Sequence, residues 1–558
     1  MKGDTKFEQI SDDFIKGYLA WRPEASVILG IHDFDGVISN FSKDSRENEL
    51  ARLKKYDQLL NDFDTTSLSP KAYYDLRILQ CGIKRELFNF EVVEAFTKNP
   101  MTYAGALDVS VYIKRNFAPL RDRLKSVIAI EKEAPEFFST AKSNLDDSLA
   151  KPYIETAIQI ARGFTDFFNS DLKTAFKELE KDSLMTVFDS VNDSAIKELN
   201  AFITWLEKEK LPKANNHYAL GKEKYRKMLL YSEAITMAPE KILSIGQAKL
   251  EQEKAIFNAT AKVINPRKKA VEVYHDLQKE HPTSNNLISD VKKDVESIRQ
   301  FIVDKKLVTM PSESHVQVKE TPTYARSTST ASMDPPGPFE KKATEAYYYV
   351  TPVDQTWTAK QKEDWLSMLD YYTTDNVTIH EVYPGHYIQF QHLNASRADK
   401  IEKIFASYAF MEGWAHYTEE LMVEEGFGKT NDPDKSAKYH LAQSGDALLR
   451  LCRLCVSIRM HCEGMSVDDA TKFFMNNWYQ GEQPSRQEAI RGTFDPEYLY
   501  YTLGKLQMLR LRDDYKKQEG AHFTLQKFHD LVLDNGMPPI QLLREMLLKD
   551  KGIWKEIL

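Results

Sequence analysis

The stretch TIHEVYPGHYIQF (residues 378–390) combines two histidines, a glutamate and a Pro-Gly pair in one short segment. Many zinc peptidases carry two histidines four residues apart on one helix face, with a glutamate after the first. Here His380 and His386 are six residues apart. On an uninterrupted helix, six residues turn about 600° and leave the two rings roughly 120° apart and about 9 Å apart along the axis. Two rings in that arrangement cannot share a metal ion.

Pro384 and Gly385 alter this geometry. Proline has no backbone N–H and forces the residue before it out of helical dihedrals, while glycine adopts dihedrals that other residues avoid. A local bulge over residues 383–385 takes up two residues and brings His386 to the place of the second ligand. Glu381 then flanks the metal as the general base. The alternative is a helix that starts at the Pro-Gly pair and two histidines with no common role.

The segment YAFMEGWAHYTEEL (residues 408–421) supplies a candidate third ligand on a second helix. Glu412, His416 and Glu419 are spaced four and then three residues apart, which places them on one helix face. Glu412 follows His386 by 26 residues, enough for a helix to end, turn and return antiparallel. Two histidines, one glutamate and an open position for water form a known catalytic zinc arrangement. A solvated stripe with an i,i+4 Glu–His pair is the alternative.

The rest of the chain predicts a mainly α-helical fold. Apolar residues recur at three- and four-residue spacings in segments such as 120–130 and 167–176. We expect a two-lobed helical protein around a deep cleft, with a helical lobe over residues 1–305 and a catalytic lobe over residues 306–558. The catalytic lobe is expected to carry a small sheet next to the metal helix, followed by the C-terminal helices.

The small β-sheet is expected over about residues 306–352. HVQVK (residues 315–319) alternates apolar and polar side chains, and AYYYV (residues 346–350) is rich in residues that favour strands. Between them, residues 327–333 are small and turn-forming, which predicts a break. The tyrosines of the second strand can offer its edge to an extended peptide, a common recognition mode. They can equally well only pack against a helix.

Composition narrows the class of protein. The chain has 558 residues, a net charge of −8 and a pI of about 6.0, which argues against a nucleic-acid-binding protein. No apolar run approaches the roughly 18–20 residues that a membrane span needs. The start, MKGDTK, lacks the apolar core of a signal peptide. We therefore expect a soluble protein, cytoplasmic for the sequence as given or exported if a leader has been removed.

Three separated motifs resemble one known family. HEVYPGH (residues 380–386), EGWAHYTEEL (residues 412–421) and RGTFDPEYLYYTLGKLQMLRLRDDY (residues 491–515) resemble the bacterial domain of unknown function 885 family. That family is regarded as related to helical zinc peptidases with an HExxH motif, such as thimet oligopeptidase and the helical metallocarboxypeptidases. The resemblance covers most of the chain and is strongest from about Leu307 onward.

The resemblance implies a zinc ion held by His380, His386 and Glu412, with Glu381 as the general base. The implied activity is zinc-dependent hydrolysis of peptide bonds in short peptides by a metal-activated water. Two rival functions stay open: hydrolysis of a non-peptide amide at the same metal, and peptide binding without catalysis. The intact Glu381 argues against the second rival, because a purely structural site has no use for a free base.

The oxyanion of such a reaction needs a hydrogen-bond donor in addition to the metal. Tyr501 and His416 are the candidates. Tyr501 lies in YYTLGK (residues 500–505), and the related peptidases also use a tyrosine from the C-terminal part of the chain. Tyr500 can take the role instead.

An enzyme that trims chain ends also needs a cation for the free carboxylate, and an arginine fork suits a carboxylate best. The cations close enough in sequence are Arg491, Lys505, Arg510 and Arg512. We take Arg491 and Arg510, together with Tyr348 of the second predicted strand, as the expected substrate-binding residues. Any one of these cations can instead be an ordinary surface charge.

Overall fold

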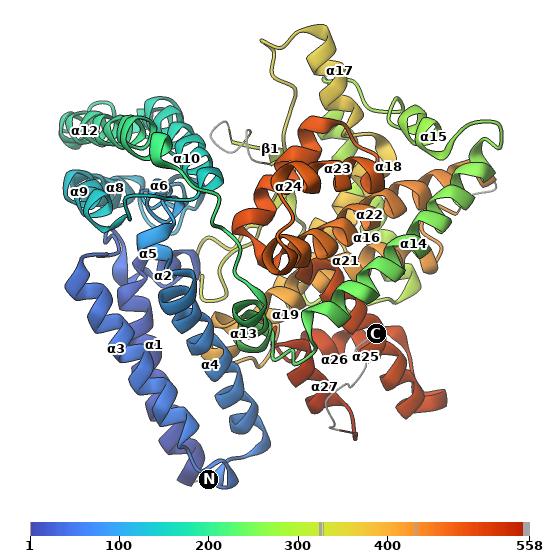
Figure 1. The fold of residues 1–558 in the computed structure, drawn as a ribbon, viewed down its shortest axis with the longest axis horizontal. Coiled ribbons are helices and arrows are strands. Elements are labelled where there is room, and N and C mark those ends of the chain that lie inside the picture. Colours follow the sequence, from blue (N-terminus) through green and yellow to red (C-terminus); the bar gives the residue numbers. More distant parts are fainter. Residues whose placement is uncertain (1, 323–325, 327–328, 430–431, 551–558) are drawn as a thin grey trace. The chain divides into compact units, whose positions relative to one another are not determined.

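The computed structural model describes residues 2–322, 326, 329–429 and 432–550. These residues form mainly α-helices, with three short strands gathered in one sheet (Figure 1). The predicted mainly helical class with a small sheet is therefore confirmed. Within the described part of the chain, no helix is both long and apolar enough to cross a lipid bilayer.

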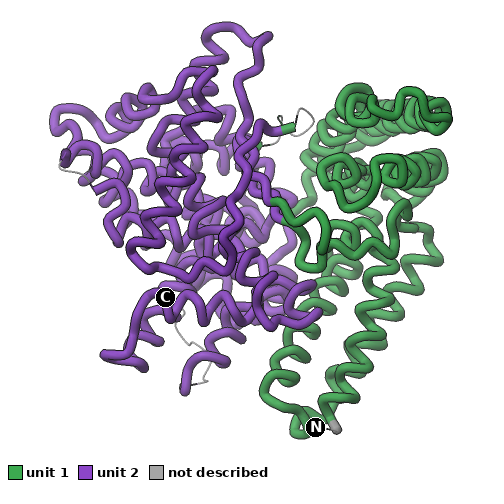
Figure 2. The backbone as a smooth tube through the Cα atoms, turned by 180° about the vertical axis from the view of Figure 1, so that it is seen from behind, with its two compact units in different colours: residues 1–218, 322–329, 336–345 green, residues 219–321, 330–335, 346–558 purple. Residues whose placement is uncertain are grey.

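The chain divides into two compact units (Figure 2). Unit 1 comprises residues 1–218, 322–329 and 336–345, and unit 2 comprises residues 219–321, 330–335 and 346–558. The division after residue 218 corrects the predicted one after residue 305. The physical reason is that α14 (Pro239–Ile264) packs along α22 (Pro433–Glu463), so that a helix of the predicted first lobe belongs with the C-terminal helices.

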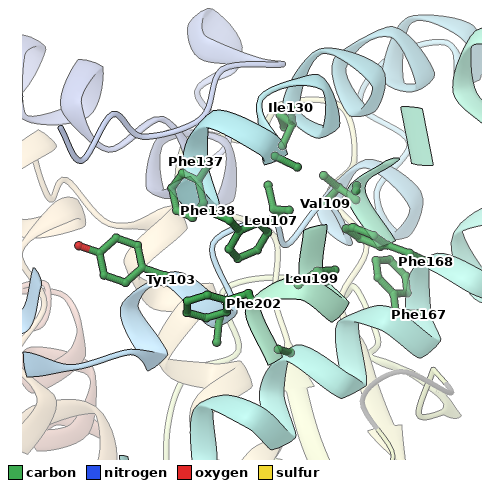
Figure 3. Close-up of a cluster of buried hydrophobic side chains, with 14 of the residues drawn as sticks. Tyr103, Leu107, Val109, Ile130, Phe137, Phe138, Phe167, Phe168, Leu199 and Phe202 are labelled. Atoms are coloured by element: carbon green, nitrogen blue, oxygen red, sulfur yellow. The ribbon is translucent and has the colours of Figure 1, made fainter. Parts of the chain in front are cut away.

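Unit 1 has a core rich in aromatic side chains (Figure 3). Phe138, Phe167 and Phe202 are almost fully buried, and the rings of Phe138 and Phe202 lie 5.1 Å apart between centroids. Each such burial stabilises the fold by roughly 1.5–3 kcal/mol. The α-helices of unit 1 are α1 (Lys2–Trp21), α2 (Pro23–Ile28), α3 (Lys43–Asn61), α4 (Pro70–Phe88), α5 (Ala95–Lys98), α6 (Met101–Ala104), α7 (Val111–Lys114), α8 (Leu120–Lys132), α9 (Ala134–Asn144), α10 (Lys151–Asn169), α11 (Asp171–Ala175) and α12 (Leu184–Trp205).

Unit 2 carries the sheet and the helices of the predicted metal site. Besides α14 and α22, its α-helices are α13 (Lys222–Glu233), α15 (Ala270–Leu277), α16 (Leu287–Lys305), α17 (Ala359–Ser367), α18 (Tyr371–Glu381), α19 (His386–Ala395), α20 (Lys400–Ile404), α21 (Tyr408–Glu424), α23 (Val467–Trp478), α24 (Glu482–Phe494), α25 (Tyr500–Glu519), α26 (Leu525–Leu533) and α27 (Ile540–Leu547).

The sheet contains both predicted strands and one more. β1 (Gln317–Glu320) and β3 (Tyr347–Val350) pair in parallel, close to where the sequence predicts strands. β2 (Ala331–Asp334) pairs antiparallel with β3, although part of it was expected to be a break. Its residues have little strand propensity of their own, so the pairing with β3 determines their conformation.

The position of β3 corrects one expectation about substrate binding. The strand order is β1-β3-β2, so both edges of β3 are already paired. The tyrosines of β3 therefore have no edge to offer to a peptide, and the edge-binding prediction is wrong. Tyr348 is fully buried, and its hydroxyl lies 3.1 Å from the Thr378 Oγ1 atom of α18. This contact joins the small sheet to α18, the helix that carries His380.

The helices α21 and α25 cross in very close contact at two glycines. A Cβ atom on Gly413 would overlap the backbone of Gly504, and a Cβ on Gly504 would overlap the carbonyl oxygen of Ala409. Only glycine allows the two backbones to approach so closely. This crossing brings the start of α25, with Tyr501, beside the part of α21 that carries Glu412.

Candidate metal centre

The backbone between α18 and α19 contains the predicted two-residue bulge. In an uninterrupted helix the carbonyl oxygen of Ile379 would accept a hydrogen bond from the N–H of residue 383. Here Gly385 N–H donates that bond instead, at 3.0 Å. His386 therefore occupies the place that residue 384 would take in a regular helix, four positions after His380. Gly385 is required at this point, because a Cβ there would overlap the carbonyl oxygen of His380.

The bulge brings the two imidazole rings together with Glu412. The ring centroids of His380 and His386 are 4.9 Å apart. Their Nε2 atoms lie 3.4 and 3.5 Å from the same atom, Oε2 of Glu412. Ligand atoms about 2.0–2.2 Å from a tetrahedral zinc ion are roughly 3.3–3.5 Å from one another. Both nitrogen–oxygen distances therefore match those around a zinc ion, and all three candidate ligand atoms lie within 4.8 Å of one another.

The Glu412 carboxylate gives an independent test of this fit. Its Oε2 atom is buried and has no hydrogen-bond partner of good geometry among the described residues. A buried charged oxygen with ion-pair contacts at 3.4 and 3.5 Å but no well-formed hydrogen bond is incompletely stabilised. A cation between Oε2 and the two Nε2 atoms would complete that stabilisation, so the residues present fit a metal ion.

The electrostatics of the three side chains point the same way. Burial alone raises the pKa of Glu412, but the charges of His386 and His380 hold it well below its usual range. Burial alone lowers the pKa of His380, but its interactions with Glu412 and Glu419 raise it to about 10. The cluster thus attracts positive charge strongly, and protons compete with a metal for the two rings.

Each histidine is held from behind through its other ring nitrogen. His380 Nδ1 lies 2.7 Å from Oε1 of Glu419, which is fully buried. His386 Nδ1 lies 2.9 Å from Oε1 of Gln389, whose amide donates to the carbonyl oxygen of Phe410 at 3.4 Å. Such contacts fix the tautomer and orientation of metal-binding histidines. The sequence-based interpretation assigned no role to Gln389, although its i+3 spacing from His386 was the available signal.

His416 lies behind Glu419 instead of beside Glu412. Its Nδ1 atom is 3.1 Å from Oε2 of Glu419, and the residue is 1% exposed. Burial, with Lys505 nearby, lowers its pKa to about 3, so the ring is neutral at physiological pH. Glu419 thus separates His416 from His380. The shared Glu419 carboxylate links the His416 ring to the ring of His380.

Glu381 is anchored by the sheet. Its Oε2 atom accepts a hydrogen bond from the Met333 N–H of β2 at 3.0 Å. The side chain is half-buried and directly follows the ligand His380. The small sheet therefore lies next to the metal helix, as predicted, and holds the expected base.

Of the two candidate tyrosines, Tyr501 lies at the cluster. Its ring is within 17° of parallel to the ring of His380, with centroids 6.2 Å apart, and it is half-buried. Tyr500 is fully buried. Arg450, Arg453 and Arg491 surround the Tyr501 ring, with guanidinium carbons 6.0, 5.1 and 5.9 Å from its centroid.

The two arginines expected to bind substrate lie in different surroundings. Arg491 lies beside Tyr501, while Arg510 forms a half-buried i,i+4 pair with Asp514. Nine residues of helix separate Tyr501 from Arg510, which corresponds to about 13 Å along α25 and to the opposite face. The structure therefore brings Arg491, but not Arg510, to the candidate centre. Lys505 and Arg512 are paired with Glu420 and Glu424.

The chain has clear relatives among known proteins. The family described as "Bacterial protein of unknown function (DUF885)" matches residues 23–547. A candidate lipoprotein of unknown function from Shewanella oneidensis has a similar structure, with a TM-score of 0.80 and 24% identity over 97% of this chain and 100% of that one. A candidate lipoprotein from Colwellia psychrerythraea has a TM-score of 0.79 and 17% identity over 98% of each chain. No curated protein matches. These identities establish a shared fold and no activity.

Proposed function

The chain belongs to the DUF885 family of bacterial proteins of unknown function, and we propose that it is a zinc-dependent peptidase acting on short peptides. The observation that carries the proposal is the convergence of two Nε2 atoms on Glu412 Oε2, at 3.4 and 3.5 Å, around an oxygen that lacks a hydrogen-bond partner of good geometry. His380, His386 and Glu412 would hold the zinc ion, which leaves a fourth position for water and substrate.

The chemistry follows from the groups around the three ligands. When bound, a zinc ion supplies Lewis-acid chemistry, polarising a carbonyl and making water acidic enough to give hydroxide near neutral pH. Glu381 accepts the proton of the attacking water and later passes a proton to the leaving amine. The Met333 N–H occupies Oε2 of Glu381, so Oε1 is the oxygen that takes this proton. Its position beside His380 is what a general base requires.

The Tyr501 hydroxyl is the proposed donor to the oxyanion. Its ring lies over His380, and the charge of Glu412 acts on it, so the phenol is close to the ligand cluster. His416 is the weaker candidate, because Glu419 separates it from His380. Arg491 is the proposed anchor for substrate. Tyr348 contacts Thr378 and Arg510 pairs with Asp514, so their observed partners do not support the same role.

The location of the protein is a further part of the proposal. Both structural relatives are described as candidate lipoproteins. This description favours the exported alternative for the present chain over the cytoplasmic one. Fractionation of cells that produce the full-length protein, with detection in envelope and cytoplasmic fractions, tests it directly.

The decisive experiment is elemental analysis of zinc per chain, combined with a peptide-library screen. We expect about one zinc in the wild type, a large loss in His386→Ala, and full retention in Glu381→Gln, which should no longer cleave peptides. His315→Ala, an exposed histidine paired with Glu296, is the matched control and should keep its zinc.

Each rival function predicts a different result. Wild-type protein without zinc after reconstitution would refute the metal centre. Zinc without peptide cleavage, together with turnover of other amides, would favour the non-peptide hydrolase. Glu381→Gln with full activity would refute the proposed base, and zinc with peptide binding but no turnover would favour a binding protein.

A further inference from the structure

Arg491 of α24 has an unusual set of partners for an arginine near a metal centre. Its Nε and Nη2 atoms both approach one oxygen, Oδ2 of Asp495, at 2.9 and 2.8 Å. Nη2 also donates to the Tyr408 hydroxyl at 3.3 Å. A guanidinium group has five N–H donors, and none of these contacts uses Nη1. The side chain is 32% exposed, so solvent and small anions can reach it.

Tyr408 places a further donor beside this guanidinium group, and the Tyr501 ring lies next to both. Tyr408 lies one helical turn before the ligand Glu412 on α21, and its ring centroid is 5.9 Å from that of Tyr501. Its hydroxyl oxygen accepts from Arg491, which leaves its own hydrogen to be donated. Both tyrosines are half-buried. Arg491 of α24 and Tyr408 of α21 thus present hydrogen-bond donors beside Tyr501, next to the ligand cluster.

Arg450 and Arg453, the other two arginines around Tyr501, already bind carboxylates of the protein. Arg453 makes two bonds of 2.7 Å to the carboxylate of Glu488 and is 9% exposed. Arg450 binds Asp446 at 2.9 Å and is 10% exposed. Arg491 is therefore the most accessible cation around Tyr501. Donors of this kind, with an arginine among them, form strong charge-assisted hydrogen bonds to a carboxylate.

The spacing identifies which carboxylate fits. The Arg491 guanidinium carbon lies 5.9 Å from the Tyr501 ring centroid, and that centroid lies 6.2 Å from the His380 ring centroid. An extended peptide advances about 3.3–3.6 Å per residue. The two distances place the Arg491 guanidinium carbon no more than about 12 Å from the His380 ring, so a carboxylate on Arg491 is within about three residues of a peptide bond at the ligand cluster.

We propose that Arg491 and Tyr408 bind the terminal carboxylate of the substrate, and that the protein is a carboxypeptidase releasing one to three residues from the ends of short peptides. This inference rests on the proposed peptidase function. The hydrolysis consumes one water, and the C-terminal fragment leaves with a new amino group. An internal peptide bond has no free carboxylate at this distance, so the same subsite disfavours cleavage within a chain.

The test compares peptides of one sequence with a free carboxylate or a C-terminal amide. We expect wild-type zinc-loaded protein to cleave the free acid at least tenfold faster in kcat/KM. Arg491→Gln should reduce this acid-to-amide ratio to near one, mainly through KM, and Tyr408→Phe should reduce it severalfold. Arg486→Gln is the matched control, because Arg486 lies on the same helix, half-exposed and paired with Asp468, and should keep the wild-type ratio.

Binding to Glu381→Gln separates this inference from the proposed function. Calorimetry should show tighter binding of the free acid than of the amide, and the difference should disappear when Arg491→Gln is added. Tighter binding of the acid without any cleavage by the wild type would refute the peptidase and support the subsite. Equal binding of acid and amide would refute the subsite. A third peptide, amidated but ending in glutamate, should bind like the plain amide, and binding like the free acid would overturn the terminal assignment.

Discussion

Two buried glutamates, one in each unit, are in opposite charge states. Glu131 of α8 in unit 1 is fully buried, and neither of its oxygens has a hydrogen-bond partner among the described residues. Burial raises its pKa to about 8. Burial acts on Glu412 of unit 2 in the same direction, yet the charges of His386 and His380 hold its pKa well below the usual range. Only the second glutamate is an anion that can bind a metal near neutral pH.

The comparison shows that burial of an acid does not by itself indicate a binding site. The core of unit 1 consists of aromatic and aliphatic side chains. Burial without a charged partner favours the neutral form of Glu131. Around Glu412, two histidines converge from a bulged helix, and Glu419 and Arg450 continue the charged network behind them. The partners, and the backbone geometry that delivers them, distinguish a candidate metal ligand from an isolated buried acid.

The variant Glu412→Gln tests this difference most directly, because it makes the side chain at position 412 neutral, as that of Glu131 is. Zinc held by protein ligands is bound with roughly 10–16 kcal/mol, and loss of one of three ligands should remove about a third of this. We therefore expect zinc affinity to fall by about 3–5 kcal/mol, or roughly 100- to 5,000-fold. Competition with a chromogenic chelator measures it. Glu131→Gln is the control and should leave zinc affinity unchanged; near-wild-type affinity in Glu412→Gln would contradict the ligand assignment.

The variant Glu131→Gln tests whether Glu131 is neutral in the folded protein, through the pH dependence of the free energy of unfolding. A folded-state pKa of about 8, above the ordinary glutamate value of 4.5, means that the contribution of Glu131 is fully favourable below pH 4.5. It is lost as the pH rises from 4.5 to about 8, because the acid then ionises in the unfolded chain but stays protonated in the folded one. The loss amounts to about 3–5 kcal/mol.

Thermal unfolding of the full chain at pH 5 and pH 9 measures this effect. We expect Glu131→Gln to be close to the wild type at pH 5 and clearly more stable at pH 9, because the amide cannot ionise. Glu136→Gln, an exposed position on α9, should follow the wild type at both values. Identical pH dependence of wild type and Glu131→Gln would show that Glu131 is not the buried neutral acid described above.

The sequence could predict which side chains gather at the candidate metal centre, because their spacing is a local property. Pro384 and Gly385 indicate a bulge within a few residues of His380, and helical periodicity places Glu412 on a defined face. The rest depends on pairing between distant segments. β2 forms because β3 lies beside it, and Met333 reaches Glu381 only as a consequence. No local pattern in residues 331–334 contains that information.

The unit boundary could not be predicted for the same reason. Residues 239–264 read as an ordinary amphipathic helix, and the sequence does not indicate against which other helix it packs. Its packing along α22 places it in unit 2. Tyr501 and Tyr500 are likewise equivalent in the sequence, and the crossing of α21 and α25 at two glycines decides which of them lies over His380.

Glu419, which lies behind His380, should have a smaller effect on zinc affinity, and Glu419→Gln tests this. The carboxylate holds His380 Nδ1 at 2.7 Å and makes that ring a stronger ligand. Removal of its charge should weaken zinc binding about 10- to 100-fold while one zinc per chain still binds at saturating metal. A structural role alone would lower the melting temperature of the metal-free protein without changing zinc affinity, so both quantities need to be measured.

Substitution of Gln389 should give the smallest effect on zinc binding. Gln389 contacts His386 with a neutral amide, whereas Glu419 contacts His380 with a carboxylate. A neutral hydrogen bond contributes about 0.5–1.5 kcal/mol, so Gln389→Met should weaken zinc binding only about 2- to 12-fold. Gln389→Glu is the informative partner variant. It places a carboxylate oxygen where the amide oxygen now lies, 2.9 Å from His386 Nδ1. If charge behind a histidine sets ligand strength, Gln389→Glu should bind zinc at least as tightly as the wild type in chelator competition. Weaker binding by both variants would mean that the shape of the amide, anchored on the carbonyl of Phe410, matters more than the charge it presents.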